Sequence, residues 1–242
     1  MPVILSIIII CLAIPNNFCQ DKTFSFDSFS LKIIKNELTA VNSNKQIFYQ
    51  KEFHSPKDFA LDLDGDGVPE FLISDSYEKD SSTFYTLYVF NTLDSLTLAD
   101  SVFSGLIEPY EIKSSEAGGM IIVSGNPAID SLNTDPDNIF LPVNCWKYQS
   151  GGLFPVNDDV YKIFINENND IIDYLDNYYE SKHEDCKSAS KVKAALASGY
   201  INYMHSGDKT LARQFLNEYY HCSDLKNFEQ YLNKICEESK CN

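Results

Sequence analysis

Residues 62–70 read Asp62-Leu-Asp-Gly-Asp-Gly-Val-Pro-Glu70, a stretch in which aspartates alternate with other residues. Carboxylates at the first, third and fifth positions converge on one point when the backbone curls, and Ca²⁺ takes such oxygen ligands. The seventh position offers its carbonyl, and the ninth closes the shell directly or through a water. The stretch therefore predicts a calcium loop with these ligands: Asp62, Asp64, Asp66, the Val68 carbonyl and Glu70.

The residues that flank the loop decide between a helical and a strand setting. An EF-hand needs a bidentate Glu at its twelfth position, where this chain has Ile73. Pro69 also lacks the backbone N–H that paired EF-hands use at the eighth position. Phe59–Leu61 and Phe71–Ile73 are short apolar runs, which are typical of buried strands. A strand-loop-strand metal site is favoured over the alternative, an acidic turn in which Asp and Gly only suit the backbone.

Residues 59–73 resemble the calcium loop of FG-GAP or VCBS-type repeats, the strand-loop-strand units of integrin-alpha-like β-propellers. Repeats of that family usually have Asp at the ninth position, whereas this chain has Glu70. The resemblance covers about fifteen residues and implies that the metal holds a loop between strands and takes no part in chemistry. It implies a blade-like sheet and does not imply a closed ring, since the chain offers too few repeats for one.

The pattern between Gln20 and Val156 is that of strands and turns. Three segments read as strand, short polar turn and second strand: Phe29–Phe53, Phe84–Phe103 and Cys145–Phe164. The calcium loop follows the first of them. The second is followed by 111–123, which ends in a similar strand but lacks the aspartates and is interpreted as a degenerate counterpart of the loop.

The hydrophobic period becomes helical after Asp159. A helix is predicted over Asp170–Tyr179, and Gly207-Asp208 marks the end of one later helix and the N-cap of the next. The apolar positions of the later helices are Val192, Leu196, Tyr200 and Tyr203; Leu211, Phe215 and Tyr219; and Phe228, Leu232 and Ile235. The predicted fold is therefore α+β, with a blade-like antiparallel β domain over 20–156 and a small helical bundle over 157–242.

The first nineteen residues predict a signal peptide. The apolar run 3–14 is shorter than the about 20 residues that a membrane-spanning helix needs, and polar residues follow Pro15. The mature chain is then expected to be secreted or periplasmic, with no membrane span.

Export makes disulfides the expected state of the remaining cysteines. A helical hairpin over 187–220 would bring Cys186 and Cys222 to the same end, so this pair is predicted to form a disulfide. The connectivity of Cys145, Cys236 and Cys241 stays open.

The amino-acid composition argues against two classes of binding partner. A formal net charge of −16 argues against nucleic acid and anionic lipid as partners, because both need basic patches. No catalytic motif is present, so the sequence favours a calcium-stabilised, non-catalytic binding or scaffold protein that contacts an envelope or extracellular protein or a glycan. The alternative is a secreted, hydrolase-like enzyme whose catalytic residues are dispersed along the chain.

Two further features have both a functional and a structural interpretation. Asp130, Asp135 and Asp137 lie in one loop and are candidates for a second cation site, although a solvated loop is favoured because their spacing is irregular. Four tyrosines are candidates for an aromatic recognition face, although the favoured interpretation is that one of each neighbouring pair is buried: Tyr178, Tyr179, Tyr219 and Tyr220.

Overall fold

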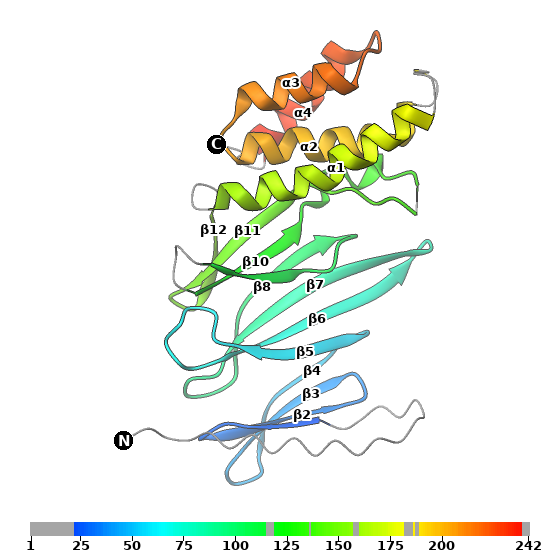
Figure 1. Ribbon diagram of the computed structural model, residues 1–242. Coiled ribbons are helices and arrows are strands. Elements are labelled where there is room, and N and C mark those ends of the chain that lie inside the picture. Colours follow the sequence, from blue (N-terminus) through cyan, green and yellow to red (C-terminus); the bar gives the residue numbers. More distant parts are fainter. Residues whose placement is uncertain are drawn as a thin grey trace. The chain divides into compact units, whose positions relative to one another are not determined.

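The computed structural model describes residues 22–114, 119–135, 137–156, 160–181, 186 and 189–238. These residues form three four-stranded antiparallel sheets followed by a helical region, which confirms the predicted α+β class (Figure 1). The chain forms two compact units, one ending at Glu52 and one beginning at Phe53. The predicted signal peptide lies outside the described residues.

The first unit contains one sheet whose strands are neighbours in chain order: β1 (Lys22–Ser25), β2 (Phe29–Ile34), β3 (Glu37–Asn42) and β4 (Ile47–Glu52). Side chains alternate across β2, with Phe29, Leu31 and Ile33 buried. The sequence predicted only two strands over 29–53. The third arises because Lys35, at φ 56°, adopts the left-handed conformation that a tight hairpin turn requires.

The second unit contains two further sheets, again in chain order. One is made of β5 (Pro56–Leu61), β6 (Glu70–Lys79), β7 (Ser82–Asn91) and β8 (Thr97–Gly105). The other is made of β9 (Tyr110–Ser114), β10 (Gly119–Gly125), β11 (Val143–Gln149) and β12 (Gly152–Pro155). All neighbouring strands in both sheets pair antiparallel.

An apolar core joins these two sheets. Leu72 of β6 and Leu87 of β7 pack in one cluster with Ile122 of β10 and Tyr148 of β11, and each is at most 2 % exposed. Leu63, from the loop between β5 and β6, is fully buried in the same cluster. The predicted metal loop is therefore attached to the core by its own second residue.

In the described part of the chain, four α-helices follow the sheets: α1 (Tyr161–Ser181), α2 (Lys193–His205), α3 (Lys209–Tyr219) and α4 (Leu225–Glu238). One short 3₁₀ segment, η1 (Pro127–Leu132), lies between β10 and β11, and another, η3 (Ala189–Lys191), precedes α2. The predicted N-cap is confirmed, because the Asp208 side chain accepts a hydrogen bond from the Leu211 N–H at 2.9 Å. None of the described helices is long and apolar enough to cross a membrane.

Helix α1 is longer than predicted, and it begins before the point where the third strand-turn-strand segment was expected to end. The predicted end of that segment is therefore wrong. That segment was expected to run to Phe164, but β12 ends at Pro155 and α1 begins at Tyr161. Phe164 is fully buried in a cluster with Val123 of β10 and Val143 of β11. A short apolar run suits a strand or a buried helix equally, and here packing against the β9–β12 sheet selects the helix.

Buried asparagines tie the helices to this sheet. The Asn202 side chain accepts a hydrogen bond from the Val143 N–H at 2.9 Å and donates one to Asn168 Oδ1 at 3.0 Å. Asn168 in turn donates to the Gly199 carbonyl. Because these buried groups satisfy one another, α1, α2 and β11 are held in one arrangement.

The structure contains the predicted disulfide between Cys186 and Cys222, whose Cα atoms lie 5.7 Å apart. An ion pair lies close to the disulfide in sequence. The Lys193 ammonium, at the start of α2, is 2.9 Å from Oδ2 of Asp224, the residue just before α4. Cys145 is a buried free thiol, and burial raises its pKa to about 12. Its neighbourhood therefore favours an unreactive thiol over a reactive thiolate.

Candidate metal centre

The acidic stretch forms the loop between β5 and β6, so the predicted strand-loop-strand arrangement is present. Gly65 and Gly67 have φ values of +80° and +89°, which L side chains rarely adopt. The two glycines thus allow the backbone to curl within nine residues.

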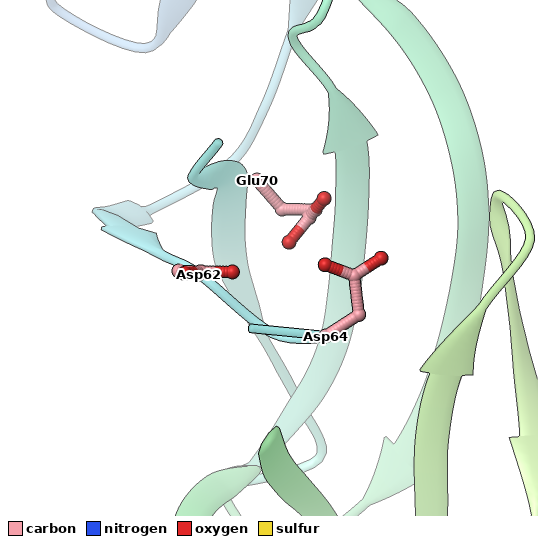
Figure 2. A group of neighbouring side chains, drawn as sticks. All are labelled: Asp62, Asp64 and Glu70. Carbon is pink, nitrogen blue, oxygen red and sulfur yellow. The ribbon is translucent and has the colours of Figure 1, made fainter. Parts of the chain in front are cut away.

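Three of the predicted carboxylates meet in this loop. One oxygen from each of Asp62, Asp64 and Glu70 lies within 4.8 Å of the others. Figure 2 shows the three carboxyl groups facing one another, with Glu70 coming from the start of β6. Asp66 is not part of this group, and its Oδ1 instead accepts a hydrogen bond from the Val68 N–H at 2.7 Å.

Hydrogen bonds from the loop's own backbone hold the aspartates. Asp62 accepts from the Gly65 N–H at 2.8 Å through one oxygen and from the Gly67 N–H at 3.0 Å through the other. Asp64 Oδ1 accepts from the Asp66 N–H at 3.2 Å. These are the local turns that aspartate forms with nearby amides, and they shape the loop without requiring a cation.

Glu70 is the member of the cluster in the least favourable surroundings. It is 4 % exposed and accepts a hydrogen bond from the Leu63 N–H at 2.9 Å. Burial, together with the negative charges of Asp64 and Asp66, raises the pKa of its carboxyl group from 4.5 to about 7. A cation at the cluster would offset both the burial and the repulsion.

The donor set fits a hard cation. All three side chains offer carboxylate oxygens, which Ca²⁺ and Mg²⁺ prefer, whereas zinc sites are usually built from Cys and His. Asp62 and Asp64 come from a curled loop and Glu70 from a strand, an arrangement that suits the adaptable shell of Ca²⁺ better than the strict octahedron of Mg²⁺.

The far end of the loop is also attached to the fold. The Thr92 hydroxyl, just after β7, donates a hydrogen bond to the Pro69 carbonyl at 2.6 Å. Leu63 is buried in the core near the other end. Between these two attachments, Gly65, Asp66 and Gly67 at the centre of the loop are exposed.

The second acidic loop is arranged differently. Asp135 accepts hydrogen bonds from the Asp137 N–H at 3.0 Å and from the Asn138 side chain at 3.1 Å. Asp130 lies in η1, and among the described residues its Oδ1 atom has no hydrogen-bond partner. Within the described part of the chain, these aspartates do not form a metal-ligating group.

Asp130 makes a testable contribution to the pH dependence of stability. Burial raises its pKa from 3.8 to about 6, so the folded protein holds this proton more tightly than the unfolded chain. The resulting stabilisation is present below pH 3.8 and is lost as pH rises to about 6. Asp130→Asn should therefore be more stable than wild type by about 1–2 kcal/mol at pH 8, and this advantage should vanish near pH 4. Urea unfolding at both pH values measures it, and an equal difference at both contradicts the assignment.

One contact that sequence spacing did not indicate joins His54 to Asp75. His54 Nδ1 lies 3.3 Å from Asp75 Oδ2, and the buried Asp75 side chain also accepts the N–H groups of His54 and Ser55. The two residues are far apart in sequence, and only the β5–β6 pairing brings them together. These hydrogen bonds to Asp75 hold the backbone just before β5 in place.

The four tyrosines separate into one buried and three partly exposed residues. Tyr220 is 2 % exposed and belongs to the helical core. Tyr178, Tyr179 and Tyr219 are partly exposed, and their rings contact one another in series, with centroid separations of 5.4 and 6.3 Å. The Tyr219 hydroxyl donates to Asp176 Oδ1 at 2.8 Å, so an acidic group lies beside the rings.

Comparisons of the chain with protein-family models, with curated protein sequences and with solved structures gave no match.

Proposed function

We propose that this is an exported, calcium-stabilised, non-catalytic binding or scaffold protein of the periplasm or cell surface. The observation that carries the proposal is the group formed by Asp62, Asp64 and the buried Glu70. Ca²⁺ is the proposed ligand, with Asp66 and the Val68 carbonyl completing its shell directly or through water.

A stabilising role is supported by where the candidate ligands lie. They come from one loop and the start of the strand that follows it, and the loop is attached to the core at Leu63 and to Thr92 near its other end. A cation bound there would fasten two neighbouring strands of one sheet. This placement supports a metal that holds structure over one that activates a substrate.

Kinship with FG-GAP or VCBS-type repeats is part of the proposal. It is supported by the three sheets, each of four antiparallel strands in chain order, which is the organisation of a propeller blade. The acidic loop joins the first two strands of the β5–β8 sheet. The proposed degenerate counterpart, 111–123, includes most of β9 and β10, the first two strands of the β9–β12 sheet.

The proposed compartment is supported by the Cys186–Cys222 disulfide, because disulfides persist mainly in oxidising compartments. The proposed binding role is supported by the tyrosine face of Tyr178, Tyr179 and Tyr219. Aromatic side chains provide large contact areas at low entropic cost, and Tyr is enriched among residues that dominate protein interfaces. An envelope or extracellular protein or a glycan is the proposed partner.

Isothermal titration calorimetry with CaCl₂ tests the metal assignment. We expect one saturable calcium site in the wild-type protein and at least a tenfold weaker site in Asp64→Ala, because a central carboxylate is removed. The matched control is Asp173→Ala, which removes one exposed aspartate from α1 and should leave the affinity unchanged. Absence of binding to the wild type, or equal weakening in both variants, would contradict the proposal.

A further inference from the structure

Leu63 connects the acidic loop to both sheets of the second unit. Its side chain lies between Asp62 and Asp64 in sequence, is fully buried and packs in the cluster that contains Ile122 and Tyr148 of the β9–β12 sheet. Its N–H donates to Glu70 Oε2 at 2.9 Å. Its carbonyl accepts the Met120 N–H, also at 2.9 Å. One residue thus links a candidate ligand to the beginning of β10.

Gly119 allows this contact to form. Its φ of +135° is one that L side chains rarely adopt. A Cβ atom at this position would lie 2.7 Å from the Leu63 carbonyl oxygen, closer than real Cβ contacts come. The backbone of β10 approaches the loop this closely only because residue 119 has no side chain.

The carboxylates also lie near the buried side of the β9–β12 sheet. Tyr148 of β11 is 2 % exposed, and its pKa is raised by burial and, to a smaller extent, by the negative charges of Glu70 and Asp64. Its hydroxyl oxygen lies 3.4 Å from the Asn91 side-chain amide at the end of β7. The Tyr148 side chain therefore reaches the end of β7 across the boundary between the two sheets.

We infer that the acidic loop couples cation binding to the docking of the β9–β12 sheet on the β5–β8 sheet, with Gly119 as a positioning residue. The inference rests on the proposed calcium site. A cation that draws Asp62, Asp64 and Glu70 together fixes the Leu63 backbone between them and with it the acceptor of the Met120 N–H. Conversely, a well-docked β10 holds Leu63 where the ligands converge. By thermodynamic linkage each event strengthens the other by the same factor.

Gly119→Ala tests the coupling, and Gly151→Ala is its matched control. Gly151 also has a positive φ, +81°, but a Cβ there meets nothing within 4 Å. Both variants carry backbone strain in the β9–β12 sheet region, whereas only Gly119→Ala displaces the Leu63 carbonyl. We expect calcium affinity measured by calorimetry to fall at least about fivefold in Gly119→Ala and to stay unchanged in Gly151→Ala.

Hydrogen exchange of the wild-type protein provides a second measurement that does not depend on the folding of a variant. Calcium should slow exchange in peptides covering 119–125 and leave α4 unchanged relative to chelator. If the wild type binds no calcium, the proposed function fails. If it binds calcium while Gly119→Ala binds equally well, or while exchange over 119–125 is the same with calcium and chelator, the coupling is wrong and the metal site stands.

Discussion

Saturating calcium should raise the melting temperature of the wild-type protein by roughly 5–10 °C, and Asp64→Ala should abolish most of that rise. A ligand that binds only the folded state stabilises it by about 2.7 kcal/mol when its free concentration is 100 times its dissociation constant. For a chain of this size each kcal/mol corresponds to about 2–4 °C. In the absence of the cation, the buried Glu70 carboxyl and its acidic neighbours destabilise the loop.

Differential scanning calorimetry with calcium and with chelator measures this effect. Asp64→Asn should lose less than Asp64→Ala, since the amide keeps an oxygen ligand, and Mg²⁺ should substitute poorly. Chelation should loosen the β5–β8 sheet before the helices. The helical signal in circular dichroism at 222 nm should therefore remain largely unchanged. Equal melting temperatures in calcium and chelator, with no heat of binding, would show that the loop is only an acidic turn.

The calcium effect should also depend on pH through Glu70. Its folded-state pKa of about 7 lies above its usual 4.5, so the cation-free folded state gains stability from the bound proton below pH 4.5 and loses it as pH rises to about 7. Calcium binds the carboxylate form, and its contribution therefore grows over the same range. The difference in melting temperature between calcium and chelator should be small at pH 5 and largest at pH 8. The opposite trend would exclude Glu70 as a ligand.

The second large effect is expected from the disulfide. Cys186→Ser should lower the free energy of unfolding by about 2–4 kcal/mol, because the bond closes a loop with a sequence separation of 36 residues. Cys186 is exposed, so this variant removes the crosslink with little loss of packing. Cys222→Ser should cost somewhat more, because Cys222 is 9 % exposed and belongs to the helical core.

Non-additivity distinguishes the crosslink from two separate packing effects. The double variant Cys186→Ser/Cys222→Ser should be little less stable than Cys222→Ser alone, because the bond is already absent from each single variant. Guanidinium unfolding of the four proteins measures the cycle. Additive losses, or peptide mapping of the unreduced protein that joins Cys186 to another cysteine, would contradict the pairing.

The sequence by itself determined the features that depend on interactions between residues close together in the chain. Alternating aspartates with Gly65 and Gly67 predict the loop because its turns are held by hydrogen bonds between residues two to five positions apart. The same holds for the Asp208 cap and for the apolar stripe of the last helix, where Phe228, Leu232 and Ile235 are buried as expected. A helical hairpin also brings its flanking cysteines together by geometry alone, which is why the disulfide could be predicted.

Tertiary structure decided what depends on contacts between distant residues. The sequence indicated Glu70 as a ligand, but its burial and raised pKa follow from packing of β6 in its sheet. The approach of Gly119 to the Leu63 carbonyl has no local signal. The helical period placed Tyr219 on the apolar face, whereas Tyr220 is the fully buried residue of the pair and Tyr219 is only partly buried. The helix at Phe164 was missed for the same reason, since a short apolar run fits a strand or a helix until a neighbouring sheet selects one. Hydrophobic burial is non-directional, so residue order specifies which side chains avoid water and leaves the choice of partners to the assembled fold.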